Sequence, residues 1–447
     1  MAVRTFSQSG HSQNSLEGFY YVPYAMTFVL VLIVVMATLS RPHVHPDEHA
    51  HLRAALYYKE HHLPPKVCAP ETLNTYSVYG ASRLNTHEIV YYLAGKFAVI
   101  MNLVPLDDYL RVRYFNVLLF VLLILIAHHR ETFRILCVPV LISPQIWYVF
   151  SYFNSEAFAI LSSLVVIYQV IDADSFFRRS LLEKRRVSAI GALLLAGVLF
   201  SSLLLAKKSF YFFVLFLILC GLAFSWNRGM RETLRSYGLR VALPVLVGIV
   251  IFGGWETLRA AVNEFELADK VAECREKTAR EAYKPSTPLD KTHPSLYWKD
   301  KGIPLEDLFN SGWAGVVFRS AFGYYGYLEV PGSPLYYDLV RYLFIAFTGY
   351  LTFSVLVQGE RIHRIFVVAA VLIFFVVFAT TIWKSWTRDF QAQGRYYFSL
   401  LPVISFICCT CWKYYNRNVL SIFVIALFLL SVHSFLYVGI AEIIKVD

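Results

Sequence analysis

The sequence predicts an all-α polytopic membrane protein, built as a bundle of about 11 transmembrane helices. Hydrophobic residues make up 57% of the 447 positions, whereas charged residues make up only 16%. A soluble domain typically has about 25% charged residues. Apolar runs of bilayer-spanning length recur along the chain, and basic residues gather in alternate connections between them. Together these observations exclude an ordinary soluble domain.

The predicted spans follow a polar N-terminal segment, 1–19, which we expect to be a disordered cytoplasmic tail. This segment lacks the charged, apolar and small-residue pattern of a cleaved signal peptide. The closely spaced runs 134–150 and 153–172 are also compatible with a re-entrant pair. The 11 predicted spans are 20–40, 113–129, 134–150, 153–172, 187–206, 209–226, 241–258, 338–357, 362–383, 396–412 and 418–440.

The charge of the short connections predicts the orientation. Those that share a side with the N-terminus are basic, which is typical of the cytoplasmic side. They contain Arg130, Arg134, Arg178, Arg179, Lys184, Arg185, Arg186, Arg228, Arg231, Arg235, Arg240, Arg361, Arg364, Lys413 and Arg417. The net charge of +10 is therefore interpreted as an orientation signal, and no nucleic-acid partner is expected.

Two long polar segments, 41–112 and 259–337, are then predicted on the outer side. The first belongs to an N-terminal transmembrane catalytic module, 20–258, and the second forms a small helical region before the C-terminal helices, 338–447. We expect a surface helix to begin at Pro46-Asp47-Glu48, because acidic residues favour the first turn of a helix. An amphipathic helix over about 256–283 is expected to open the second segment.

The two outer segments each carry one cysteine, Cys68 and Cys274. A disulfide is permitted on the outer side and requires Cα atoms within about 7 Å. We therefore predict that Cys68 and Cys274 lie close enough to bridge; the alternative is two unrelated thiols.

The most informative motif is His43-Val44-His45-Pro46-Asp47-Glu48-His49-Ala50-His51, just after the first span. Charge is costly beside an apolar bilayer and tends to mark function there. One alternative is that the two acids only cap the surface helix. Another is a divalent cation held by His45, His49 and His51. Because neighbouring loop residues rarely all converge, we expect no metal or other cofactor.

Further polar residues lie at predicted outer ends of spans and suit an anion such as a lipid phosphate. They are Asn154, Lys207, Lys208, Trp386, Arg388, Gln393, Arg395 and Tyr396. Simpler interpretations are snorkelling lysines at the interface and arginines that offset nearby acids. Glu156, near a helix start, is interpreted as structural rather than catalytic.

The combination of these motifs resembles the GT-C superfamily of integral-membrane glycosyltransferases. The resemblance rests on His45-Pro46-Asp47-Glu48 with His51, Lys207, Phe322-Gly323-Tyr324 and Gln393-Gly394-Arg395-Tyr396, in this order. It is closest to a poorly characterised group of bacterial cell-envelope or O-antigen-modifying members. The resemblance implies a GT-C-like helix bundle in the bacterial inner membrane, with an active site that faces the periplasm.

The implied activity is transfer of a hexosyl or pentosyl group from a polyprenyl-phosphate donor, such as undecaprenyl phosphate, with inversion. The acceptor is a cell-envelope glycan such as lipopolysaccharide, or a lipid-linked glycan. Donor-synthase and flippase proteins are the implied partners. Asp47 is the implied general base. Glu48 is implied to orient the acceptor or to act as the base in place of Asp47. Arg395, Lys207, Lys208 and Arg388 are assigned to the donor phosphate, and His45, His51, Asn154, Gln393, Tyr396 and Trp386 to the substrates.

Other functions remain open at this stage. One is a different polyprenyl-linked transferase or ligase. Another is a flippase or transporter of lipid-linked sugar, although transporters usually place ionisable residues near the bilayer midplane. A metalloprotease is disfavoured because the His-Glu-x-x-His spacing is absent.

Overall fold

The computed structural model describes residues 19–179, 189–230 and 238–445. Within these ranges the chain is mainly helical, with one antiparallel pair of strands, β1 (Tyr324–Tyr325) and β2 (Val330–Pro331). The predicted N-terminal tail, apart from Phe19, lies outside the described residues, as do Lys184, Arg185, Arg186, Arg231 and Arg235. The structure therefore confirms the all-α class for the part of the chain that it describes.

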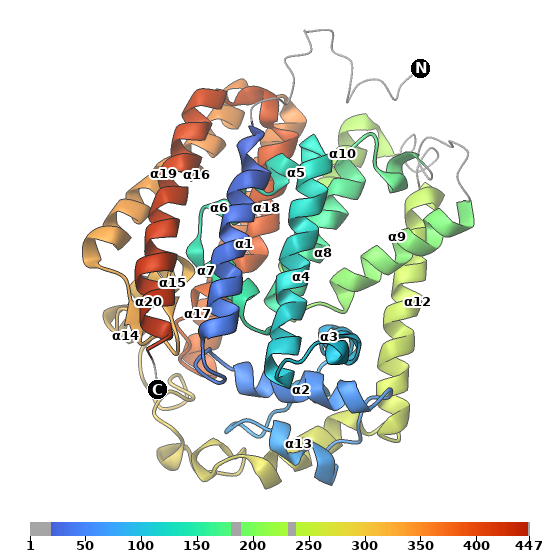
Figure 1. Ribbon diagram of the computed structural model, residues 1–447, viewed down its shortest axis with the longest axis vertical. Coiled ribbons are helices and arrows are strands. Elements are labelled where there is room, and N and C mark those ends of the chain that lie inside the picture. The colour runs from blue at the N-terminus through green and yellow to red at the C-terminus, as the bar shows by residue number, and fades with distance from the viewer. Residues whose placement is uncertain (1–18, 180–188, 231–237, 446–447) are drawn as a thin grey trace.

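The helices follow one another as a bundle with several surface elements (Figure 1). The α-helices are α1 (Tyr21–Leu39), α2 (Glu48–Glu60), α3 (Val90–Ile100), α4 (Asp108–His129), α5 (Glu131–Leu136), α6 (Val138–Leu141), α7 (Pro144–Ser151), α8 (Glu156–Ile171), α9 (Ala189–Leu204), α10 (Tyr211–Arg228), α12 (Leu239–Val262), α13 (Leu267–Thr278), α14 (Leu305–Asn310), α15 (Trp313–Ala321), α16 (Pro334–Gln358), α17 (Arg361–Thr387), α18 (Leu401–Thr410), α19 (Arg417–His433) and α20 (Ala441–Ile443). Two short 3₁₀ helices matter below, η4 (Arg83–Asn85) and η11 (Gly394–Leu400).

Seven helices among the described residues are long and apolar enough to cross a membrane, and the bent pair α7–α8 would make eight. The seven are α1, α4, α10, α12, α16, α17 and the continuous segment from α19 to α20. They establish a multi-pass integral membrane protein, but the predicted count of 11 is not confirmed. Run 134–150 is divided among α5, α6 and α7, with prolines at the starts of α6 and α7.

The other unconfirmed spans are short or bent for local reasons. The predicted run 153–172 is α8, which meets α7 at 115°. Run 187–206 contains the 16-residue helix α9. Run 396–412 begins as the 3₁₀ helix η11 and continues as α18, which has only 10 residues. An apolar run thus predicts burial or lipid contact more securely than a complete crossing.

The two long polar segments meet at one end of the bundle, which we call the loop end. Figure 1 shows α2, α3 and α13 across this end, opposite the start of α1. Cys68 and Cys274 form a disulfide there, with Cα atoms 5.8 Å apart. The backbone amide of Val67 also donates to Asn263 Oδ1 at 2.8 Å. The predicted bridge is confirmed, and the two segments form one joined layer.

The helix predicted over 256–283 is not continuous. Helix α12 extends to Val262, and the chain then turns through Glu264 and Phe265, both with positive φ, before α13 begins. The surface helix predicted after the first span is present as α2. It buries Leu52, Ala55 and Tyr58 and packs closely on α3, where a Cβ on Gly95 would lie 2.6 Å from the Ala55 carbonyl oxygen.

Candidate functional site

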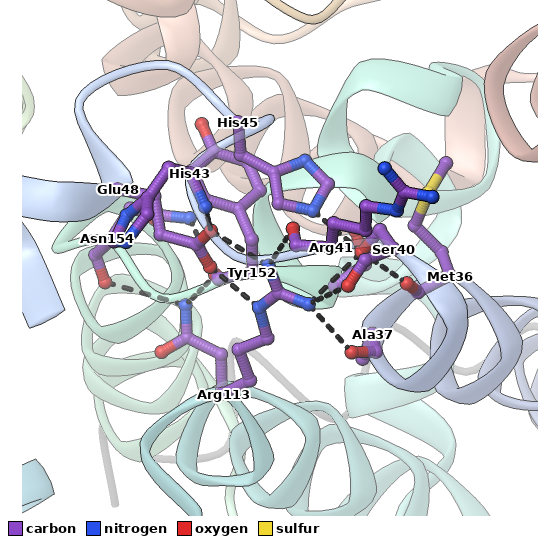
Figure 2. A network of polar contacts seen from close by, with 12 residues as sticks. Met36, Ala37, Ser40, Arg41, His43, His45, Glu48, Arg113, Tyr152 and Asn154 are labelled. Atoms are coloured by element: carbon purple, nitrogen blue, oxygen red, sulfur yellow. Dashed lines mark hydrogen bonds and ion pairs between the residues drawn. The ribbon is translucent and has the colours of Figure 1, made fainter. Parts of the chain in front are cut away.

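The first acid–guanidinium pair of the loop end joins Glu48 to Arg113 in α4, and both side chains are fully buried. Arg113 Nε donates to Glu48 Oε1 at 2.6 Å, and Arg113 Nη2 donates to Glu48 Oε2 at 2.7 Å. Its remaining donors reach the backbone oxygens of Ala37, Ser40 and Arg41 (Figure 2). Arg113 thereby satisfies carbonyl groups that are left unpaired at the C-terminus of α1.

This network is structural in character. It ties the end of α1 to the start of α2 and to α4, and thus fixes the loop between them. His45 belongs to the same region: its ring nitrogens bond to Ser40 Oγ and Tyr148 Oη, both at 2.8 Å, and its ring stacks on Tyr152. Glu48 was predicted to be catalytic and His45 to bind a substrate. The polar atoms of both side chains are already used inside the protein, so we assign both residues to the support of the loop.

The second pair joins Asp47 to Arg395. Asp47 has a left-handed backbone conformation, with φ 59°, directly before α2. Its side chain is 39% exposed, and its Oδ2 accepts from Arg395 Nη2 at 2.5 Å. A second guanidinium, that of Arg83 in η4, lies 3.7 Å from the same oxygen. Non-glycine residues in strained backbone regions cluster at functional sites.

These cations determine the charge of Asp47. Burial would raise the pKa of its carboxyl group, but Arg395 and Arg83 outweigh this effect and hold the pKa well below its usual range. Asp47 is therefore a carboxylate at neutral pH and accepts protons only weakly while both cations face it.

The position of Arg395 depends on close packing between η11 and α15. A Cβ on Gly394 would lie 2.2 Å from the backbone nitrogen of Ala321, so only glycine fits there. The Gly394 amide donates to Ser320 Oγ at 2.7 Å, and Arg395 Nε donates to Gln393 Oε1 at 2.6 Å. The predicted run from Gln393 to Arg395 is thus held against Asp47, about 350 positions earlier in the chain.

A pocket of about 100 Å³ opens beside this pair. Polar groups and aromatic rings line it, a mixture typical of small-molecule sites. The lining residues are Pro46, Asp47, Gln145, Val149, Tyr152, Ser320, Tyr324, Gly326, Tyr327, Leu328, Gln393, Gly394 and Arg395. Asp47, Gln393 and Arg395 are the predicted site residues that it unites.

Several charged and polar side chains outside the pocket interact electrostatically with the Asp47–Arg395 pair. Lys207 forms an ion pair with Glu156 at the start of α8, and both interact with the charge of Arg395. His51 bonds through Nδ1 to Tyr91 Oη at 2.9 Å, and Tyr91 donates to Glu88. Burial first, and then Arg83, holds the pKa of His51 well below its usual range, so its imidazole is neutral. Lys207 and His51 thus lie in the same charged neighbourhood as Arg83 and Arg395.

Other predicted residues make their contacts elsewhere. Asn154 caps the start of α8, because its Oδ1 accepts from the Glu156 amide at 3.0 Å. Trp386 donates to the Ile303 carbonyl oxygen at 2.8 Å. Lys208 and Arg388 are exposed. Tyr396, next to Arg395, donates to Gln391. None of these five lines the pocket.

The histidine motif does not gather into a cation site. The described residues contain no group of three His, Cys, Asp or Glu side chains arranged to hold a metal ion. His45 and His51 are buried, whereas His49 is exposed and faces His43. Successive residues of the loop and of α2 point in different directions, as the alternation of burial shows.

The prediction missed Arg83, Arg113 and Glu88. Arg113 is the first residue of the predicted span 113–129 and was counted as part of it. Arg83 and Glu88 lie in the polar segment 41–112, in a stretch without a recognisable motif. A charge directly at the start of an apolar run, as at Arg113, is the signal that points to a buried partner.

No protein-family model and no curated protein matches this chain. A crystal structure of ArnT from Cupriavidus metallidurans, bound to undecaprenyl phosphate, is similar with a TM-score of 0.43 and 15% sequence identity. The match covers 89% of this chain and 60% of that one, so this chain spans about three fifths of the length of that protein.

Proposed function

We propose that this protein is a membrane glycosyltransferase of the GT-C type that uses a polyprenyl-phosphate-linked sugar. The observation that carries the proposal is Asp47, an ionised carboxylate that opens to a pocket and contacts two guanidinium groups. A base for an acceptor hydroxyl and cations for a phosphate are the groups that such a transfer needs. The motif resemblance described above is consistent with the same activity.

In the proposed reaction, the acceptor hydroxyl oxygen forms a bond to the anomeric carbon, and its proton passes to Asp47. The bond between that carbon and the phosphate oxygen breaks, and the electron pair leaves with the polyprenyl phosphate. Arg395 neutralises the developing charge, since its planar fork meets two phosphate oxygens. Attack opposite the leaving group inverts the configuration of the sugar.

The remaining assignments follow from the placement of each group. Lys207 adds positive charge beside Arg395, and Gln393 orients the Arg395 side chain. Tyr152, Tyr324 and Tyr327 provide ring faces for the sugar. Glu48 has no place in the reaction, because both its oxygens are bonded to Arg113. We propose that the site faces the non-cytoplasmic side, on the basis of the basic connections at the opposite end. The motif resemblance further favours the periplasmic side of a bacterial inner membrane.

The test uses the purified full chain in lipid nanodiscs, with radiolabelled undecaprenyl-phosphate hexose and pentose and an envelope-lipid extract as acceptor. We expect Asp47→Asn to reduce transfer by about 10²-fold or more, because proton acceptance is lost. Asp338→Asn, which removes an exposed carboxylate at the start of α16, serves as the matched control.

Transfer by Asp47→Asn at the wild-type rate would remove Asp47 as the base. Sealed vesicles test the transporter alternative with the same labelled lipids. Movement of the label across the bilayer without transfer to any acceptor would contradict the proposed activity.

A further inference from the structure

Arg83, at the loop end, carries a guanidinium group that interacts electrostatically with Tyr91, Glu88 and Asp47. It makes no side-chain hydrogen bond with the described residues, and its ion pair is the 3.7 Å approach to Asp47 Oδ2. The side chain is only 31% exposed. A guanidinium has five donors, and a donor that is shielded from water is costly to leave without a partner. The contrast with Arg113, whose donors are all engaged, indicates that Arg83 is kept available for a ligand.

The backbone around Arg83 is firmly held. Ser82 caps η4 by accepting from the Leu84 amide at 3.2 Å, and Ser82 Oγ also bonds to Thr75 Oγ1 at 2.6 Å. Leu84 is buried. Arg259 in α12 donates to the Asn85 carbonyl oxygen at 2.6 Å. The guanidinium therefore extends from a rigid support toward Asp47 and is not carried by a loose loop.

Two guanidinium groups thus converge on one oxygen of one carboxylate. Arg395 contacts Asp47 Oδ2 at 2.5 Å, and Arg83 faces the same atom. Like charges repel at this range, so their convergence requires an anion between them. A carboxylate engages them through a single oxygen, whereas a phosphate group offers an oxygen to each.

We propose that Arg83 and Arg395 form a two-guanidinium site for the donor phosphate, and that the Asp47 carboxylate occupies this site until the phosphate arrives. This inference rests on the proposed function. Phosphate binding draws both guanidinium groups away from Asp47. The carboxylate then becomes free to accept a proton and more basic, since the cations that suppressed its basicity face the phosphate.

Coupling of this kind is reciprocal. If the phosphate displaces Asp47 from the arginines, Asp47 must oppose phosphate binding by the same free energy. Removing the carboxylate should therefore tighten phosphate binding even though it abolishes the base. Glu88 interacts electrostatically with Arg83, and Lys207 with both arginines, but each also has a closer partner, Tyr91 and Glu156 respectively.

The experiment measures binding of undecaprenyl phosphate, without a sugar, to the full chain in nanodiscs. We expect Arg83→Gln to weaken binding by roughly 10-fold and Asp47→Asn to tighten it by roughly 3–10-fold. In the Arg83→Gln/Arg395→Gln background, Asp47→Asn should give no gain, because the shared guanidinium groups are absent. Asp338→Asn is the matched control for a general change in charge.

Three results would overturn the inference: wild-type binding by Arg83→Gln, unchanged or weaker binding by Asp47→Asn, or an equal gain in the double-arginine background. Equal binding of undecaprenol would show that the phosphate is not recognised. Inorganic phosphate should compete only at millimolar concentration, and competition at the affinity of the lipid would assign the site to a soluble anion instead.

The variants are first checked by thermal unfolding, and Arg83→Lys provides a second variant that keeps the charge but loses the planar fork. Because the assay contains no sugar, it is independent of transfer. If the variants show the expected changes in undecaprenyl phosphate binding but no protein transfers sugar, the proposed function alone is contradicted. Sugar transfer that requires Asp47 but not Arg83 would contradict the two-guanidinium site and leave the proposed function intact.

Discussion

Two acids adjacent in sequence, Asp47 and Glu48, form ion pairs with opposite properties. The Glu48–Arg113 pair is fully buried, bidentate and surrounded by backbone acceptors. The Asp47–Arg395 pair is partly exposed, lies at the wall of a pocket, and faces a second arginine, Arg83, whose guanidinium makes no hydrogen bond with the residues that the structure describes. One helix start thus separates the two side chains into different environments.

The difference between the two pairs shows how the number of occupied hydrogen-bond partners distinguishes a structural ion pair from a functional one. A buried pair in which every polar atom has a partner holds the chain in place but offers nothing to a ligand. A pair with open donors and solvent access can exchange partners. We therefore expect variants of the first pair to change stability and variants of the second to change activity.

The largest expected effect belongs to Glu48→Gln. It leaves the Arg113 charge buried without its counter-charge, which should destabilise the fold by about 3–5 kcal/mol. Thermal unfolding of the purified protein would report this as a lower transition temperature and a lower folded yield. Asp338→Asn, at an exposed carboxylate, provides the control, with a near wild-type transition. A wild-type transition for Glu48→Gln would mean that the buried pair is not structural.

Next in size is the loss of transfer in Arg395→Lys. A lysine keeps the charge but cannot make the bidentate phosphate contact, so we expect roughly 10-fold slower transfer. The matched variant is Arg341→Lys, at an exposed ion pair with Asp338 on α16, which should leave transfer unchanged. Initial rates at saturating and limiting donor separate catalysis from binding. Unchanged rates for Arg395→Lys would assign the phosphate to other cations.

The pH dependence sharpens the comparison further. In the donor-free protein the pKa of Asp47 lies well below its usual range, so the acid limb of kcat/KM should lie below the ordinary aspartate value of about 3.9. In the donor complex the arginines face the phosphate, and the pKa of Asp47 rises. Since the carboxylate is the active form, the acid limb of kcat should lie at higher pH than that of kcat/KM. Coincident limbs would contradict partner exchange.

The smallest effects are expected at Lys208 and Arg388. Both were predicted to bind the donor phosphate, but both side chains are exposed and absent from the pocket wall. Lys208→Ala and Arg388→Gln should therefore transfer sugar within about twofold of the wild-type rate, as surface substitutions usually do little. The neighbouring Lys207→Ala should lower the rate more. A large loss in Lys208→Ala would place the donor outside the pocket described here.

Sequence patterns were sufficient for some features. Apolar runs predicted the helices, since burial or lipid contact requires apolar side chains. Cys68 and Cys274 were identified as the outer pair and are bridged. The spans were less predictable, because proline-broken segments such as α5 to α7 are as apolar as a complete crossing.

The sequence by itself determined the membrane class, the helical fold and the residue types of the candidate site. It could do so because the composition and periodicity of a segment reflect whether it faces lipid, the protein interior or water. Tertiary structure decided which acid of Asp47-Glu48 meets a buried arginine and which faces a pocket. It also decided that Arg83 approaches Asp47, whereas Arg388 stays outside. Those outcomes depend on contacts between α1, α4, η4 and η11, which are distant in the chain. Local sequence carries no signal for them, because the partner that satisfies a charge is supplied by the folded protein.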